Sequence, residues 1–126
     1  LGLEILARYK AFSAVGCDPN IMGIGPVPAT RRILEKTNLS LDDIDLIELN
    51  EAFAAQTIAC IRELQIDEEK LNVNGGAIAL GHPLAATGAI LVTKMVYEMK
   101  RREENLGLIT FCCGGGQGVA MILERD

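Results

Sequence analysis

The sequence predicts an α/β fold in which a mixed five-stranded sheet carries helices, in the order β-α-β-α-β-α-β-β. Apolar runs of strand length alternate along the chain with stretches of helical periodicity. The last two apolar runs are separated by GGGQG, which is typical of a hairpin turn. With 126 residues, of which 49% are hydrophobic, the chain is long enough for one buried core. We therefore treat residues 1–126 as one domain.

The first strand is predicted over residues 3–15, where apolar and polar side chains alternate. The segment 22–28 is rich in Gly and Pro and is predicted to be irregular. A short amphipathic helix should follow, with Pro28 at its first position and Asn38 as its C-terminal stop.

The second strand is predicted over residues 44–49, followed by a helix over 52–64. Asn50 is well suited to cap that helix, because its side chain accepts hydrogen bonds from free backbone N–H groups. Glu51 would complement the positive end of the helix dipole. This capping role is the ordinary structural explanation of the Asn50-Glu51 pair.

The remaining elements lead into and away from the glycine-rich stretch 74–88. Residues 71–73 are predicted to form a third short strand, and residues 87–104 an amphipathic helix. The segments 107–113 and 119–123 are the two strands of the hairpin. Neighbouring residues of a strand point to opposite faces, so Cys112 and Cys113 should not both point into one site.

Composition excludes several classes of function. A net charge of −5 argues against a nucleic-acid-binding face. No apolar run reaches the roughly 18 residues that a membrane span needs. Four cysteines without a CxxC pair, beside a single histidine, fit neither a zinc site nor a disulfide framework, so we expect no metal and reduced thiols. We expect a cytoplasmic location, although the chain begins at Leu1 and a missing N-terminal part could carry a targeting peptide.

The best candidate for chemistry is His82, the one histidine of the chain, which lies among glycines and next to Pro83. Histidine is the side chain best suited to move protons near neutral pH. Asn50 follows the second predicted strand and Cys112 ends the fourth, at the strand ends where α/β folds place ligands. A histidine that merely closes a turn is the alternative. Motifs for nucleoside triphosphates, dinucleotides and serine hydrolases are all absent.

Four blocks of sequence resemble the C-terminal half of the thiolases, the acetyl-CoA C-acyltransferases. They are MGIGPVPA, NEAFAAQ, NGGAIALGHP and CCGGGQG, which begin at residues 22, 50, 74 and 112. The blocks occur in the family's order and extend over nearly the whole chain. The combination also separates this family from the ketoacyl-carrier-protein synthases and from the sterol-carrier-type thiolases.

The resemblance implies four catalytic residues. His82 is similar to the histidine that activates a nucleophilic cysteine and donates to the thioester oxyanion. Cys112 is similar to the cysteine that removes and returns the α-proton of the second acyl group. Asn50 resembles the residue that positions an oxyanion-hole water, and the backbone N–H of Gly114 resembles a second oxyanion donor. Hydrogen-bond donors and a protonated His82 should lower the pKa of Cys112.

Met22 and Phe53 resemble pocket residues near the pantetheine arm of coenzyme A. The implied activity is acyl transfer between CoA thioesters, either acetoacetyl-CoA formation or 3-oxoacyl-CoA thiolysis in fatty acid metabolism. The CoA thioester is then a substrate, and no other cofactor is expected. Thiolases carry their nucleophilic cysteine in an N-terminal half, and neither Cys17 nor Cys60 lies in such a motif.

We therefore expect the chain alone to be inactive and the complete enzyme to be a homo-oligomer, a dimer or a tetramer. A non-catalytic thiolase-fold partner or a dimerisation domain is the alternative. Two residues depart from the family pattern GHPLGxSG, since Ala85 and Thr87 stand in place of Gly and Ser. If the loop needs a positive φ at position 85, alanine would strain it. Threonine keeps the hydroxyl group of serine.

Overall fold

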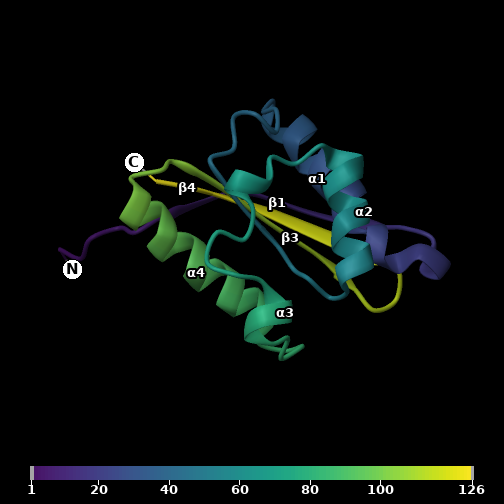
Figure 1. Ribbon diagram of the computed structural model, residues 1–126. Coiled ribbons are helices and arrows are strands. Elements are labelled where there is room, and N and C mark those ends of the chain that lie inside the picture. The colour runs from purple at the N-terminus through teal and green to yellow at the C-terminus, as the bar shows by residue number, and fades with distance from the viewer. Residues whose placement is uncertain (1, 126) are drawn as a thin grey trace.

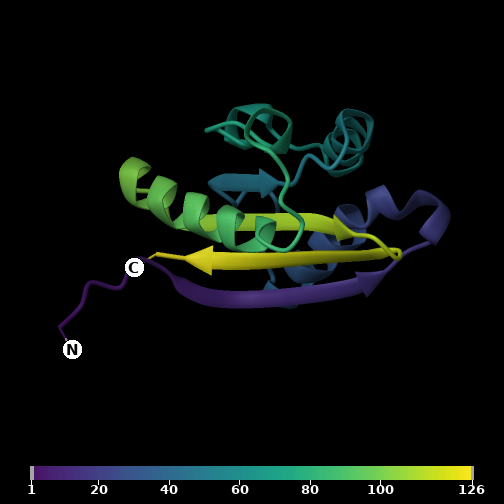
Figure 2. The same cartoon turned by 90° about the horizontal axis from the view of Figure 1, so that it is seen from below.

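Four strands form one mixed sheet in the computed structural model, which describes residues 2–125 (Figure 1). The strands are β1 (Arg8–Gly16), β2 (Leu46–Leu49), β3 (Leu106–Cys113) and β4 (Gln117–Glu124), in the spatial order β1-β4-β3-β2. β4 pairs antiparallel with β1 and β3, whereas β2 and β3 are parallel. β1, β2 and β3 therefore run in the same direction, and their carboxyl ends meet at one edge of the sheet (Figure 2).

Helices cover both faces of this sheet. α1 (Pro26–Thr37) and α2 (Ala54–Leu64) lie on one face, and α4 (Thr87–Arg102) lies on the other. α3 (Ala77–Leu80) and two 3-10 helices, η1 (Pro19–Ile24) and η2 (Glu68–Lys70), lie in the connections. Within residues 2–125, no helix combines the length and the hydropathy of a membrane span.

The pleat of β3 divides the core into two clusters. Leu108 packs with Ile33, Ile47 and Ile122 beneath α1, whereas its neighbour Ile109 packs beneath α4. The cluster that contains Ile109 also includes three buried side chains of α4: Leu91, Met95 and Met99. α2 and α4 thus cover opposite faces of the sheet.

The predicted strand over residues 71–73 is wrong, so the sheet has four strands instead of five. Leu71 makes only an isolated parallel bridge with Ile47. The next residue, Asn72, has a left-handed backbone with φ of 45°, which ends the extended conformation. Its side-chain amide replaces the missing strand, because it pairs with the backbone N–H and C=O of Leu49 at 3.0 and 2.9 Å.

Asn50 does not cap a helix, which removes the ordinary explanation for it. α2 begins at Ala54 with Phe53 at the N-cap position, and the Gln56 side chain accepts a hydrogen bond from the Phe53 N–H at 3.4 Å. Residues 50–52 form an irregular connection between β2 and α2. The Asn50 side chain is free to act elsewhere, and it is 2% exposed.

Other boundaries differ from the predictions in smaller ways. β1 begins at Arg8 because the last residue of its partner β4, Glu124, lies opposite. α1 begins at Pro26, two residues before the predicted start, and it stops at Asn38 as predicted, where the backbone is left-handed. Part of the Gly- and Pro-rich segment predicted to be irregular forms η1.

An apolar groove of about 380 Å³ lies on the α4 face of the sheet. α4 covers β2, β3 and the end of β4 at Leu123, but leaves the rest of β4 and β1 open on that side (Figure 2). Side chains from three strands and α4 line the groove, among them Phe12, Val92, Phe111 and Met121. An exposed apolar surface of this kind is typical of a face that packs against another protein segment.

Candidate active site

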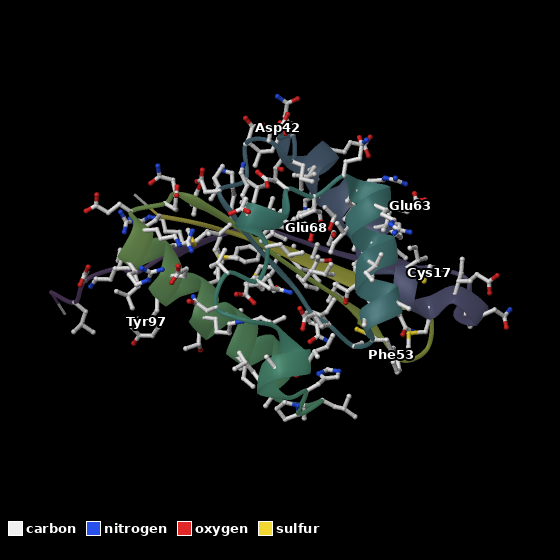
Figure 3. The ribbon with its side chains drawn as sticks, in the orientation of Figure 1. Cys17, Asp42, Phe53, Glu63, Glu68 and Tyr97 are labelled. Atoms are coloured by element: carbon white, nitrogen blue, oxygen red, sulfur yellow. The ribbon has the colours of Figure 1, made fainter. Side chains whose placement is uncertain are left out.

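One cavity at the carboxyl edge of the sheet brings together most of the predicted site residues. It has a volume of about 450 Å³. Its walls include five of the six predicted residues: Met22, Phe53, His82, Cys112 and Gly114. The sixth, Asn50, contacts His82. In Figure 3, Phe53 lies at the start of α2, on the side of the molecule where β3 and β4 join.

His82 is held between two polar side chains. Its Nε2 atom lies 3.4 Å from Asn50 Nδ2, and its Nδ1 atom lies 2.7 Å from Thr87 Oγ1. Thr87 Oγ1 also lies 3.2 Å from the carbonyl oxygen of Pro83. The Oδ1 atom of Asn50 is buried and has no hydrogen-bond partner among residues 2–125. A buried polar atom of this kind can serve a bound polar group.

The backbone before His82 explains why the imidazole faces the cavity. α3 ends at Leu80, and the next residue, Gly81, has φ of +97°. Residues other than glycine rarely adopt this backbone conformation. Glycine at position 81 therefore lets the chain leave α3 in this conformation immediately before His82. After Pro83, the backbone turns into α4, whose first residue is Thr87. The histidine is thus fixed by the short helix before it and by the long helix after it.

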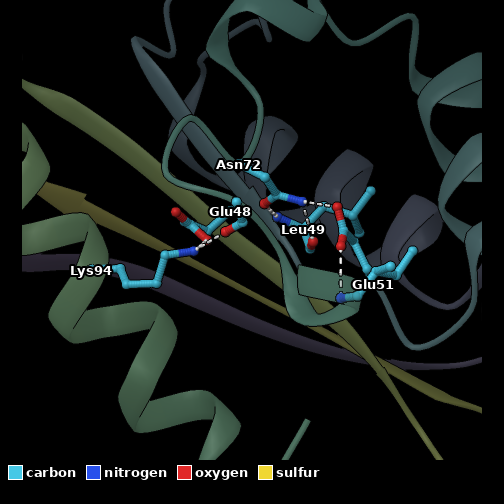
Figure 4. Close-up of polar contacts among 7 residues, drawn as sticks. Glu48, Leu49, Glu51, Asn72 and Lys94 are labelled. Atoms are coloured by element: carbon cyan, nitrogen blue, oxygen red, sulfur yellow. Dashed lines mark hydrogen bonds and ion pairs between the residues drawn. The ribbon is translucent and has the colours of Figure 1, made fainter. Parts of the chain in front are cut away.

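A second polar network ties the histidine loop (residues 74–86, which carry His82) to the end of β2 (Figure 4). The Glu51 carboxylate accepts a hydrogen bond from Asn72 Nδ2 at 3.2 Å and another from the backbone N–H of Ile78 at 3.0 Å. Ile78 belongs to the first turn of α3, whose N-cap residue is a glycine without a capping side chain. Glu51 therefore supplies the missing cap, instead of acting on α2 as the sequence suggested.

A buried ion pair supports the same loop from the α4 side. Lys94 Nζ donates to Glu48 Oε2 at 2.8 Å and to the carbonyl oxygen of Gly75 at 2.6 Å (Figure 4). Glu48 is 3% exposed. Burial raises the pKa of Glu48 above its ordinary value, and the hydrogen bond and charge of Lys94 act in the opposite direction.

The two adjacent cysteines occupy different positions at the end of β3. Cys112 continues the face of Leu108 and Thr110, towards α1, whereas Cys113 continues the face of Phe111. Both residues line the cavity, which lies at the end of the strand. Burial raises the pKa of Cys112, which is opposite to the lowering that we expected from neighbouring donors.

The two departures from the family pattern are accommodated without strain. Ala85 does not have a positive φ, so alanine costs nothing at that position. Thr87 uses its hydroxyl group on His82. Neither this contact nor the roles of Glu51, Asn72 and Lys94 were predicted from the sequence. Thr87 lies five residues after the histidine, and this short spacing is the signal that could have indicated it.

Known proteins resemble the chain over nearly all of its length. A family model described as the thiolase C-terminal domain matches residues 3–125. The chain is 57% identical over 126 residues to an acetyl-CoA acetyltransferase of Pseudomonas aeruginosa, and all of the chain aligns with 32% of that protein. It is 56% identical over 124 residues to a 3-ketoacyl-CoA thiolase of Bacillus subtilis, and 98% of the chain aligns with 32% of that protein.

Solved structures agree with these relatives. The Bacillus anthracis acetyl-CoA acetyltransferase superposes with a TM-score of 0.96 at 52% identity, over 98% of this chain and 31% of that one. Human mitochondrial 3-ketoacyl-CoA thiolase in complex with CoA superposes with a TM-score of 0.94 at 51% identity, over 96% of this chain and 31% of that one. The chain spans about a third of the length of these relatives. Together with the match over residues 3–125, this shows that the chain belongs to the thiolase C-terminal domain family.

Proposed function

We propose that the complete protein containing this chain transfers acyl groups between coenzyme A thioesters. The observation that carries the proposal is the single cavity that His82 and Cys112 line together, with Asn50 against the histidine. An acetyl-CoA acetyltransferase and a 3-ketoacyl-CoA thiolase each share more than half of their aligned residues with this chain. The reaction is then acetoacetyl-CoA formation or its reverse, 3-oxoacyl-CoA thiolysis.

In this proposal, His82 accepts the proton of a nucleophilic thiol and so activates it towards the thioester carbonyl. Cys112 exchanges a proton with the α-carbon of the second acyl group. The raised pKa of Cys112 keeps its thiol protonated at neutral pH, so it can give a proton to a carbanion once it has been placed beside one.

The remaining residues stabilise charge and hold the substrate. The unpartnered Oδ1 atom of Asn50 suits a water molecule that stabilises the oxyanion. Gly114 lies in an open turn where an added Cβ would meet nothing within 4 Å, so an acyl group can approach its backbone. Met22 and Phe53 also line the cavity and supply apolar contacts for the pantetheine arm.

The nucleophilic thiol would come from the part of the protein that this chain does not include. The relatives are about three times as long as the chain. We propose that the remaining part covers the apolar groove beside α4 and places its thiol opposite His82. The isolated chain is then inactive, because no covalent acyl-enzyme can form.

The test is an assay of the complete protein with acetoacetyl-CoA and CoA. The measured quantity is the rate at which the 3-oxoacyl thioester is consumed. We expect turnover in the complete protein and a loss of at least about 100-fold in kcat for His82→Ala. The 126-residue chain, assayed alone, should give no turnover. An inactive complete protein, or an isolated chain that is acetylated by acetyl-CoA at an enzyme-like rate, would overturn the proposal.

A further inference from the structure

We propose that Thr87 is a positioning residue that holds the neutral His82 ring in the tautomer protonated on Nδ1. This leaves the lone pair of the ring on Nε2, the nitrogen that contacts Asn50. The inference rests on the proposed function for its kinetic consequence, whereas the tautomer itself follows from the contacts of the ring alone.

The first step is the position of Thr87. It is the first residue of α4 and is 5% exposed, so its side chain is fixed by the helix and by its surroundings. Its Oγ1 atom has two close polar neighbours, His82 Nδ1 at 2.7 Å and the Pro83 carbonyl oxygen at 3.2 Å. The bond to a carbonyl four residues earlier is usual for a hydroxyl group in a helix.

The number of hydrogens on Thr87 Oγ1 decides the direction of these two hydrogen bonds. A threonine hydroxyl carries one hydrogen, and a carbonyl oxygen can only accept. If Thr87 donates to Pro83, then the hydrogen between Oγ1 and Nδ1 must belong to the imidazole. His82 therefore donates from Nδ1 to the hydroxyl oxygen.

On the other side of the ring, the contact with Asn50 agrees with this assignment. The side-chain NH₂ of Asn50 faces His82 Nε2 at 3.4 Å, and an amide NH₂ can only donate. Nε2 must then accept, so it carries no hydrogen in the neutral ring. Hydrogen bonds thus run in one direction from Asn50 through His82 and Thr87 to Pro83, without two donors facing each other.

The consequence concerns which nitrogen is the base. Nε2 lies on the Asn50 side, where a reacting group can approach, whereas Nδ1 is occupied by Thr87. When Nε2 takes a proton, the ring keeps its Nδ1 hydrogen bond to Thr87. Serine at position 87 would supply the same hydroxyl group. Valine would keep the branched shape and remove both hydrogen bonds.

The experiment compares three variants of the complete protein: Thr87→Val, Thr87→Ser and Thr37→Val. Thr37 is the matched control, because its hydroxyl also donates to a carbonyl four residues earlier, at 2.8 Å, but on α1 and away from the cavity. We expect Thr87→Val to lower kcat by about 10-fold or more while KM for the acyl-CoA changes by less than about 2-fold. Thr87→Ser should restore most of kcat, and Thr37→Val should leave it unchanged.

Nitrogen-15 NMR of histidine-labelled protein gives the second readout, with the His82 signals assigned by their absence in His82→Ala. We expect a protonated Nδ1 and an unprotonated Nε2 in the wild type, and a mixture of tautomers in Thr87→Val. A wild-type ring protonated on Nε2 overturns the inference, as does a Thr87→Val enzyme with unchanged kcat. If the wild type shows no acyl transfer, the proposed function fails, and the NMR spectra still decide the tautomer.

Discussion

The carboxylate of Glu51 lies so close to the Cα atom of Gly76 that a side chain at position 76 would collide with it. This explains a glycine that no turn geometry requires, since the φ of Gly76 is −104°. The two residues lie in different sequence blocks, one after β2 and the other before α3. Their contact holds the start of the histidine loop against the end of the sheet.

The first prediction is that Gly76→Ala destabilises the complete protein by about 1–3 kcal/mol, as overpacking typically does. The new methyl group would displace the Glu51 carboxylate and break its bonds to Ile78 and Asn72. Denaturant unfolding measures the change. Gly16→Ala is the control, because its Cβ would meet only the Gly116 backbone oxygen, at 4.0 Å.

A double-mutant cycle sharpens this test. In a Glu51→Ala background, Gly76→Ala should cost little, because the carboxylate that it collides with has been removed. Equal costs in both backgrounds would mean that Gly76 is required for a reason unrelated to Glu51.

The second prediction concerns acid stability. Hydrogen bonds from Arg101 lower the pKa of Glu98 to about 2, against burial and with further help from Asn74 and Arg102. Because the folded state lowers this pKa from 4.5, Glu98 stabilises the fold above pH 4.5 and loses that contribution as the pH falls towards 2. We expect Glu98→Gln to be less stable at pH 7 by about 1–2 kcal/mol, a value reduced by solvent screening at the exposed Arg101.

The difference between wild type and Glu98→Gln should therefore shrink between pH 4.5 and pH 2, as measured by urea unfolding at a series of pH values. Glu35→Gln, an exposed residue of α1, provides the control and should show no such trend. A difference that stays constant with pH would rule out a lowered pKa at Glu98.

The third prediction separates the adjacent cysteines. In the complete protein, Cys112→Ala should lower kcat by at least about 100-fold, because a proton-transfer group would be lost. Cys113→Ala should mainly cost packing, about 1 kcal/mol of stability. Turnover and thermal unfolding of both variants measure the two effects. If Cys113→Ala is the inactive variant, the roles assigned to Cys112 and Gly114 are wrong.

The fourth prediction is that the apolar groove is covered in the complete protein. Thr93 lines the groove and is exposed in this chain. A cysteine introduced there, in Thr93→Cys, should react with a thiol reagent at least about 10-fold more slowly than one in Glu35→Cys. This ratio follows from burial, since a thiol must be accessible to react. Equal labelling rates would show that the groove faces solvent.

Elements with a long regular pattern could be predicted from the sequence. The helix α4 has Leu91, Met95 and Met99 at intervals of four, and all three are buried as expected. The hairpin of β3 and β4 was indicated by two apolar runs around a glycine-rich turn. In these cases, local sequence and tertiary structure favour the same conformation.

The errors arose where a side chain replaced a backbone partner. Leu71 and Val73 have strand-like side chains, but the backbone of Asn72 is left-handed and its amide group pairs with Leu49. Asn50 is a residue type that often caps helices, yet its side chain contacts His82, which lies 32 residues further along the chain. Such contacts depend on which segments the fold brings together, and a local pattern does not contain that information.

The position of β1 has a consequence for folding kinetics. Within residues 2–125, β1 pairs with β4 alone, and the Lys10–Glu124 ion pair at 2.6 Å joins residues separated by 114 positions. During synthesis, β1 must therefore wait for β4, the last of these four strands along the chain, before it acquires this partner. Closing so long a loop costs entropy before any contact repays it, which slows the search for the native pairing. Until then, the backbone of β1 has an unsatisfied edge that another newly made chain can pair with, so chaperone dependence during synthesis should be greatest before β4 emerges.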